Sequence, residues 1–274
     1  MGTIDSGRLG KDKFLFPGRA GVFFGKRSFF GILLLFVFFT QNPVLQAHPF
    51  QPGEKLTYVL KLHGVPVGSQ VFEVRDGMRI RGRLTYLLFS SVKSSRFFSF
   101  FYYINDELES FADIDTLYSL RSRIRFQEGK LFRNYEVEID MDRMTALFED
   151  KSTKKRWEQE VSFPIFDLVS LIYWLRTQNH RVGETFSVFF IDTGLIHGEV
   201  KEIKIDVSEE EEEVSTYVGT FSAIRYSQAG EDKKITLWIS QEEGNIPVKL
   251  QLSTRLGNVT AYLAKIEGRE GESR

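Results

Sequence analysis

The chain contains no cysteine in its 274 residues. It therefore forms no disulfides and has no thiol for nucleophilic or redox chemistry. It also lacks the cysteine to which exported bacterial lipoproteins attach their lipid at the cleavage site. If the chain is exported to an oxidising compartment, it has to fold without disulfides.

Histidine is scarce, with four residues in the whole chain: His48, His63, His180 and His197. No two of them have the close spacing of metal ligands, such as the HExxH helix motif. A Gly-x-Ser-x-Gly nucleophile elbow and a glycine-rich phosphate loop are also absent. Asp113 and Asp115 could form a carboxylate pair, but on a turn such residues usually cap the backbone. The sequence thus predicts no metal, no cofactor and no catalytic residue, and so a protein that is not an enzyme.

The chain has little excess charge of either sign, with 36 basic and 37 acidic residues. Residues 1–47 hold six of the basic and two of the acidic residues, so the remainder carries a net charge of about −5. Binding of nucleic acid requires a surplus of Lys and Arg to neutralise phosphates. We therefore expect no nucleic-acid partner.

Residues 1–47 have the pattern of a secretory signal peptide: a basic stretch, an apolar run and a short polar stretch that ends LQA before His48. The apolar run, FFGILLLFVFF at residues 29–39, is eleven residues long. A helix needs about 20 residues to span a bilayer. The pattern predicts export to the periplasm or beyond. The alternative is an uncleaved segment that anchors the chain to the inner membrane.

After this segment, about a dozen stretches alternate apolar and polar residues as β-strands do. Residues 54–62 and 131–140 are the clearest, and Asp76 with Gly77 predicts a hairpin turn between strands. So many strands in one sheet curl or close. We expect an all-β, mainly antiparallel fold, with residues 48–274 as one domain whose curved sheet closes into a barrel or half-barrel.

Residues 163–183 depart from this alternation and predict one central helix, over about residues 165–178. Asp167 can cap its start, and Arg176 lies near its end, where cations are favoured. The helix is too apolar to face water, so we expect it to plug or cover the sheet. Capping is the plain role for Arg176. The alternative is contact with an anionic head group at the mouth of a cavity.

Six aromatic residues lie within residues 97–103, FFSFFYY. The surrounding stretch, residues 90–103, predicts either a short helix across one end of the sheet or a strand buried on both faces. Packing in the core is the favoured interpretation. The alternative is an apolar wall around a ligand.

Short motifs along the chain resemble one known family. PGEKLTY at residues 52–58 and GVPVG at 64–68 are similar to its opening, DLVS at 167–170 and YWLR at 173–176 to its central helix, and VGTF at 218–221, LWIS at 237–240 and IPVK at 246–249 to its last strands. Over most of residues 50–266 the chain thus resembles the bacterial envelope family known as domain of unknown function 3108. The resemblance implies an exported, β-rich protein. It implies no catalytic residue, because the family has no established activity.

Two hypotheses of function follow. In the first, the protein binds an apolar or lipidic ligand in its curved sheet, without catalysis. The ligand-binding residues would be Phe97, Phe98, Phe101 and Trp174 as cavity wall and Arg176 as head-group contact. In the second, it is an interaction module that docks another envelope protein through its sheet face or edge. An open aromatic-lined cavity favours the first, and a filled core with an exposed aromatic patch favours the second.

Overall fold

The structure is a computed structural model that describes residues 48–193, 198–230, 235–242, 244–254 and 257–268. These residues belong to one compact unit, Gln46–Arg274. The expected signal segment, residues 1–47, and His197 lie outside the described residues.

The described residues form one sheet of 16 strands, one α-helix and one short 3-10 helix. The strands are β1 (Lys55–Leu62), β2 (Val65–Ile80), β3 (Arg83–Ser94), β4 (Asn105–Asp113), β5 (Ser119–Glu128), β6 (Leu131–Asp140), β7 (Thr145–Asp150), β8 (Lys155–Glu160), β9 (Ile165–Phe166), β10 (Thr185–Asp192), β11 (Glu199–Val207), β12 (Glu212–Ser215), β13 (Thr220–Gln228), β14 (Ile235–Ser240), β15 (Pro247–Thr254) and β16 (Gly257–Glu267). The helices are η1 (Phe98–Phe100) and α1 (Leu168–Leu175).

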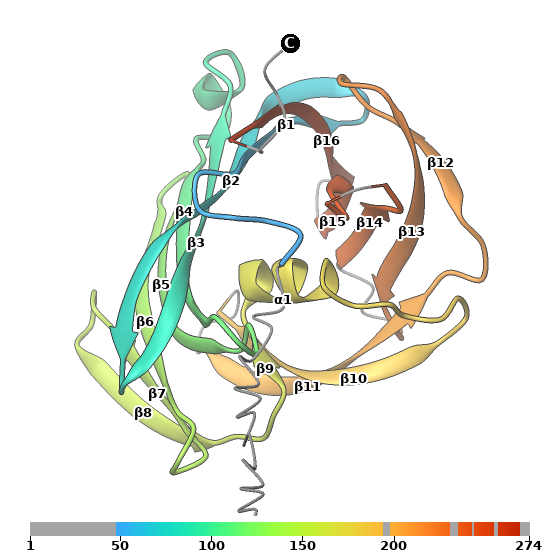
Figure 1. Cartoon of the computed structure of the whole chain (residues 1–274). Helices are drawn as coiled ribbons and strands as arrows, with labels where there is room; N and C mark the ends of the chain where they lie inside the picture. Colours follow the sequence, from blue (N-terminus) through green and yellow to red (C-terminus); the bar gives the residue numbers. More distant parts are fainter. Residues whose placement is uncertain (1–47, 194–197, 231–234, 243, 255–256, 269–274) are drawn as a thin grey trace, which may run out of the picture. The chain divides into compact units, whose positions relative to one another are not determined.

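The sheet curls around α1, as Figure 1 shows. Its strand order is β8-β7-β6-β5-β4-β3-β2-β1-β16-β15-β14-β13-β11-β10-β9, and β12 pairs with β13 off this path. Every pairing is antiparallel except that of β9 with β10. Since β8 and β9 form the two ends of the path, no backbone ladder among the described residues closes the ring. The prediction of an all-β, mainly antiparallel curved sheet with one central helix is confirmed.

Side chains from β8 bond to the start of β11, which is the third strand from the other end of the path. The side-chain amide of Gln159 donates to the carbonyl oxygen of Val200 on β11 (2.7 Å) and accepts from its N–H (2.8 Å). The indole N–H of Trp157 donates to the carbonyl oxygen of Gly198 (3.0 Å). Gln159 thus bonds to β11 as a peptide group of a neighbouring strand would. The N–H and carbonyl oxygen of Val200, which an exposed sheet edge would leave without a partner, are thereby hydrogen-bonded.

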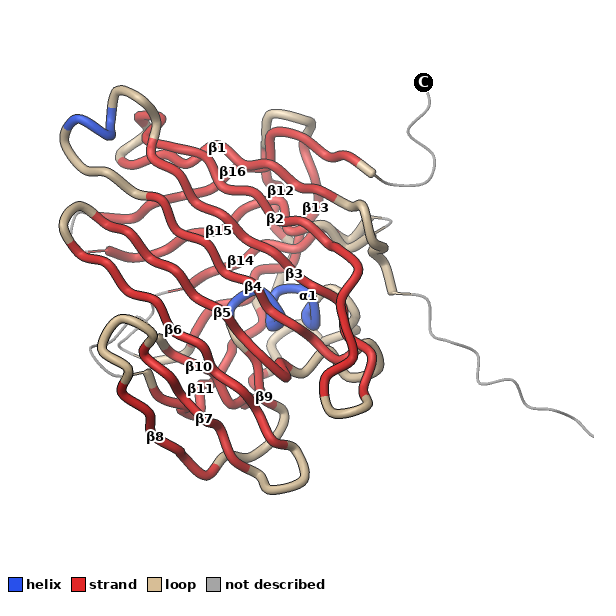
Figure 2. Tube along the Cα trace, turned by 90° about the vertical axis from the view of Figure 1, so that its left-hand side faces the viewer, coloured by secondary structure: helices blue, strands red, loops and turns tan. Residues whose placement is uncertain are grey.

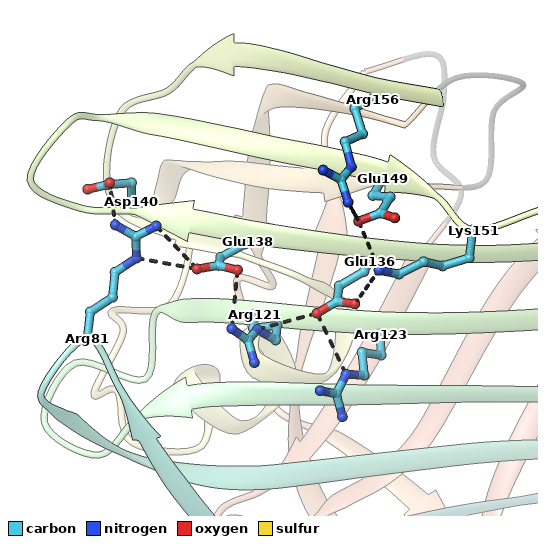
Figure 3. A network of polar contacts seen from close by, with 9 residues as sticks. All are labelled: Arg81, Arg121, Arg123, Glu136, Glu138, Asp140, Glu149, Lys151 and Arg156. Atoms are coloured by element: carbon cyan, nitrogen blue, oxygen red, sulfur yellow. Dashed lines mark hydrogen bonds and ion pairs between the residues drawn. The ribbon is translucent and has the colours of Figure 1, made fainter. Parts of the chain in front are cut away.

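The outer face of β5–β7 is polar, as the alternation in residues 131–140 predicts. Tyr135, Val137 and Ile139 are buried, whereas Glu136 and Glu138 face outward. The outward carboxylates join a lattice of cross-strand ion pairs, shown in Figure 3, with partners Arg81, Arg121, Arg123 and Lys151. Exposed ion pairs contribute little stability. The lattice therefore identifies this face as the solvated one, as the alternation predicts.

The turn predicted at Asp76 and Gly77 is wrong. β2 continues through this point, bulges against β3, and the chain reverses at Arg81 and Gly82, whose φ angles are 48° and 83°. A Cβ atom on Gly77 would lie 2.1 Å from the carbonyl oxygen of Thr85. Glycine is required at this position because the two strands approach closely at the bulge, and not because the chain turns there.

Helix α1 begins as the sequence predicts. The Oδ1 atom of Asp167 accepts from the N–H groups of Val169 (3.0 Å) and Ser170 (2.9 Å), and the Ser170 hydroxyl accepts from the Asp167 N–H (3.0 Å), which completes a capping box. The helix is shorter than the predicted residues 165–178, because residues 165 and 166 pair with β10 instead. Its buried residues are Val169, Ser170, Leu171, Ile172, Tyr173 and Leu175. Across the described ranges, no helix has the length and hydrophobicity to cross a bilayer.

The aromatic segment does not pack in the core, in contrast to the favoured prediction. Strand β3 runs to Ser94, and the chain then forms the short helix η1 in the loop to β4. Phe97, Phe100 and Phe101 are 74%, 84% and 74% exposed, and Phe98 alone of the four phenylalanines packs against the core. The loop extends past the end of the sheet (Figure 2), and three of its four phenylalanine rings are exposed there.

Candidate functional site

A cavity of about 500 Å³ lies inside the curved sheet. Because alternate residues of each strand point inward, most strands of the sheet contribute to its wall. The apolar lining residues are Leu60, Val92, Leu108, Ile124, Phe126, Leu131, Leu168, Phe190, Ile191, Ile203, Ile235, Leu250, Leu252, Val259 and Ala261. Cavities of about 300–1,000 Å³ with such a lining are the usual sites of small apolar ligands.

Helix α1 closes the inner end of the cavity through Asp167 and Leu168. The Asp167 carboxylate is already bonded: besides capping α1, its Oδ2 atom accepts from the hydroxyls of Ser119 (3.0 Å) and Ser122 (2.6 Å) on β5. These bonds attach the start of the helix to the sheet wall. Asp167 therefore holds α1 in place and has no free oxygen directed at a ligand.

The other end of the cavity opens between hairpin ends. Leu131 follows the β5–β6 turn and Leu252 lies near the end of β15; both line the cavity and are 46% and 48% exposed. A residue that both lines a cavity and meets solvent marks its mouth. A ligand would enter at this end, opposite α1.

A few polar side chains also line the cavity. Lys201 and Asp192 form an ion pair (2.5 Å) between β11 and β10. On the other wall, Asp106 accepts from the N–H of Gln127 (2.9 Å) near Glu128. Burial raises the pKa of Asp106 to about 7, with a further contribution from Glu128, although the bond from Gln127 opposes it. The mouth thus offers hydrogen-bonding groups of both charges around an apolar interior.

None of the five predicted ligand-binding residues lines this cavity. Phe97 and Phe101 face solvent, and Phe98 packs against the core. Trp174 packs against the rings of Phe166 (4.9 Å between centroids), His180 and Phe186. The alternation of the strands, rather than the aromatic cluster, was the signal that could have identified the wall, since the lining residues occupy the inward positions of strands that the sequence does predict.

The head-group role considered for Arg176 is wrong on this geometry. Arg176 and Glu54 are both completely buried and form a bidentate ion pair of 2.5 and 2.9 Å. The remaining guanidinium N–H groups donate to backbone carbonyls, among them those of Gly244 (3.0 Å) and Asn245 (3.1 Å). Burial disfavours the charge on Arg176, but the hydrogen bonds that it donates to Glu54 and the negative charge of Glu54 outweigh burial and raise the pKa of Arg176. Arg176 fastens the end of α1 to β1 and to the β14–β15 turn.

Metal binding finds no support in the side chains that the structure describes, since no three His, Asp or Glu residues among them come together as ligands. Besides Asp167, the polar residues that line the cavity are Gln70, Ser90, Asp106, Glu107, Glu128, Arg133, Asp192, Thr193, Lys201, Gln228 and Gln251. What the arrangement offers chemically is an enclosed apolar volume with a polar mouth.

A family model described as "Protein of unknown function (DUF3108)" matches residues 56–264, and this is the family that the motifs resemble. A search of curated proteins finds no match.

Two solved structures are similar in fold. A beta-barrel-like protein of domain of unknown function DUF1849 from Brucella abortus has a TM-score of 0.52 at 9% identity, covering 80% of this chain and 98% of that one. A putative exported protein with YmcC-like fold from Bacteroides fragilis covers 81% of this chain and 98% of that one at 12% identity, with a TM-score of 0.29. The first supports the barrel-like fold alone, and the second is too distant to carry an argument.

Proposed function

The chain belongs to the DUF3108 family of proteins of unknown function, and we propose that it is a non-enzymatic protein of the cell envelope that binds an apolar or lipidic ligand. The observation that carries the proposal is the cavity of about 500 Å³, whose lining is mostly apolar, with Leu168 of α1 at one end and the exposed Leu131 and Leu252 at the other. An apolar lining gives little binding energy to a polar ligand. An acyl chain inside, with its polar end near the mouth, fits this distribution of side chains.

The place of action follows from the N-terminal sequence. A basic stretch and a short apolar run before His48 favour export into the periplasm, or attachment to the inner membrane if the segment is not cleaved. Both locations give the protein access to membrane lipids.

Titration of the protein with an environment-sensitive fatty-acid probe tests the proposal. Wild type should bind the probe saturably. Val259→Trp places a large ring in the cavity and should weaken binding by about tenfold or more, equivalent to about 1.4 kcal/mol. The matched control is Thr260→Trp, because this neighbour on β16 points to the opposite face and should bind as wild type does.

Two outcomes would contradict the proposal. Folded wild-type protein that shows no saturable binding would remove the ligand hypothesis and leave docking of an envelope protein. Equal weakening by both tryptophan variants would place the probe outside the cavity.

A further inference from the structure

The mouth of the cavity is surrounded on one side by exposed apolar side chains. This apolar rim consists of Val65, Phe97, Phe100, Phe101, Leu131 and Phe132, which are between 46% and 84% exposed. We propose that the apolar rim inserts into the surface of a lipid bilayer with anionic head groups. This contact goes beyond ligand binding, because it concerns the outside of the molecule and not the cavity.

The aromatic part of the rim is held outward by its own loop. The hydroxyls of Ser94 and Ser99 are bonded to each other (2.7 Å), and Ser94 also accepts from the N–H of Ile104 (3.0 Å). The Ser95 hydroxyl accepts from the N–H of Phe98 (3.2 Å). These bonds satisfy the backbone of the turn, so the phenylalanine rings around it are presented to solvent by a defined structure. Figure 2 shows the short helix of this loop, η1, at the outer tip of the loop.

The loop is joined to the mouth of the cavity. The N–H of Gly129 donates to the carbonyl oxygen of Tyr103 (2.7 Å), and the Tyr102 hydroxyl donates to Glu128 (3.3 Å). Glu128 and Leu131, on either side of this turn, line the cavity. Insertion of the rim would therefore bring the mouth to the lipid surface, with Tyr102 and Tyr103 at the polar boundary that tyrosine prefers.

The charges around the rim fit anionic lipid. Residues 93–104 and 129–133 contain no acidic residue, although the chain after residue 47 is acidic overall. The carboxylates that border these segments, Asp106, Glu107 and Glu128, line the cavity. Lys93, Arg96 and Lys130 are exposed, and none of them forms an ion pair with any residue that the structure describes. Each basic residue near an anionic surface adds attraction, and exposed aromatic rings add apolar contact.

The size of the rim favours a membrane over a protein partner. A stable protein interface takes about 20–30 residues a side, whereas the rim offers a few side chains on a narrow tip. A bilayer requires no complementary shape, so a small apolar tip with basic neighbours is sufficient for reversible attachment.

The absence of cysteine permits a direct test. Phe100→Cys in the full chain provides one labelling site for an NBD fluorophore, and Leu147→Cys, exposed on the outer face of β7, is the matched control. With vesicles of phosphatidylethanolamine and phosphatidylglycerol, the label at residue 100 should shift to the blue and brighten severalfold, and the label at residue 147 should not. Attachment through residues 1–47 would bring both labels near the vesicle but would immerse neither, so the difference between the two positions reports the rim itself.

A second variant measures how much the aromatic rings contribute to the affinity for the vesicle. This variant combines Phe97→Ser, Phe100→Ser and Phe101→Ser, and the label is attached through Phe132→Cys. The lipid concentration that gives half of the blue shift should rise by about tenfold or more. The variant should melt as wild type does, because the three replaced rings are exposed. Binding of the soluble fatty-acid probe should be unchanged, which separates this proposal from the one for the cavity. No blue shift at residue 100, or an equal shift at residues 100 and 147, would overturn membrane insertion and favour a protein partner.

Discussion

The buried pair of Glu54 and Arg176 is the most consequential polar contact in the described core. Removing one partner of a buried pair leaves a charge without compensation, which typically costs about 3–5 kcal/mol. We predict that Glu54→Gln lowers the free energy of unfolding by this amount, since Arg176 is completely buried. Urea denaturation of wild type and variant measures it.

The matched control for this prediction is Glu138→Gln in the surface lattice of Figure 3. Its partners Arg81 and Arg121 are 49% and 21% exposed, whereas Arg176 is completely buried, so the denaturation midpoint should move much less than that of Glu54→Gln. If Glu54→Gln were as harmless as Glu138→Gln, the pair would not be fastening α1 to β1.

Asp106 gives the protein a pH-dependent stability. Its pKa is raised to about 7 by burial and by Glu128, above the usual carboxyl value of 3.8. The native state therefore holds this proton more tightly than the unfolded state does, and the stability that this provides is lost as pH rises from about 4 to 7. We predict that Asp106→Asn is more stable than wild type at pH 8 by on the order of 1 kcal/mol, after allowance for solvent screening.

The same comparison at pH 4 should show little difference between Asp106→Asn and wild type, because the carboxyl is then protonated in the native state. Asp142→Asn, at an exposed turn position, is the control for removal of a surface carboxylate. Equal stability of Asp106→Asn and wild type at both pH values would contradict the raised pKa.

Residue roles that depend on neighbouring positions could be predicted from sequence, and those that depend on distant partners could not. Asp167 caps α1 as predicted, because its partners are two and three residues away. The partner of Arg176 is Glu54, 122 positions earlier, and no local pattern connects them. Phe97 and Phe101 were expected to line a core or a cavity, but hydrophobicity alone does not tell whether the fold supplies a surface to cover them.

Helix α1 is the element on which the inner end of the cavity depends. Leu171 is 6% exposed within it. We predict that Leu171→Asp unfolds the domain, because an unpaired buried charge costs several kcal/mol, on the order of the whole stability. Circular dichroism and thermal melting measure the loss, with Asn179→Asp as a control in the exposed segment after the helix. A Leu171→Asp protein that melts like wild type would mean that α1 does not carry the core.

At the scale of elements, periodicity identified the strands and the helix, whereas turn chemistry was ambiguous. The Asp76 and Gly77 pair has the composition of a hairpin turn, but the same glycine also suits a bulge where two strands approach. The turn itself uses Arg81 with Gly82 instead. Local composition cannot choose between these sites, because the choice depends on how far β2 can pair with β3.

For the molecule as a whole, we predict that the exported protein begins at or near His48. The basic stretch and the eleven-residue apolar run before it motivate this expectation. N-terminal sequencing of native protein from a cell fraction decides the question. Intact Met1 on a protein that remains in the cytoplasm would exclude export.

The curvature of the sheet was predictable from the number of strands, since a large twisted sheet curls. The residues that line the cavity were not, because its wall combines strands from both halves of the chain, such as β4 with Leu108 and β16 with Ala261. Only the order of strands around the ring determines which inward residues face one another.

The contact of Gln159 and Trp157 with β11 has a consequence for the range of ligands that the protein can hold. In a fully hydrogen-bonded barrel, strand number and shear fix the radius. Here three side-chain hydrogen bonds replace one ladder of the ring, and each contributes about 1 kcal/mol. Val200 on β11 also packs in one hydrophobic cluster with Phe148 and Trp157. We therefore expect any change in the circumference to occur at this contact, because a change elsewhere would break a backbone ladder.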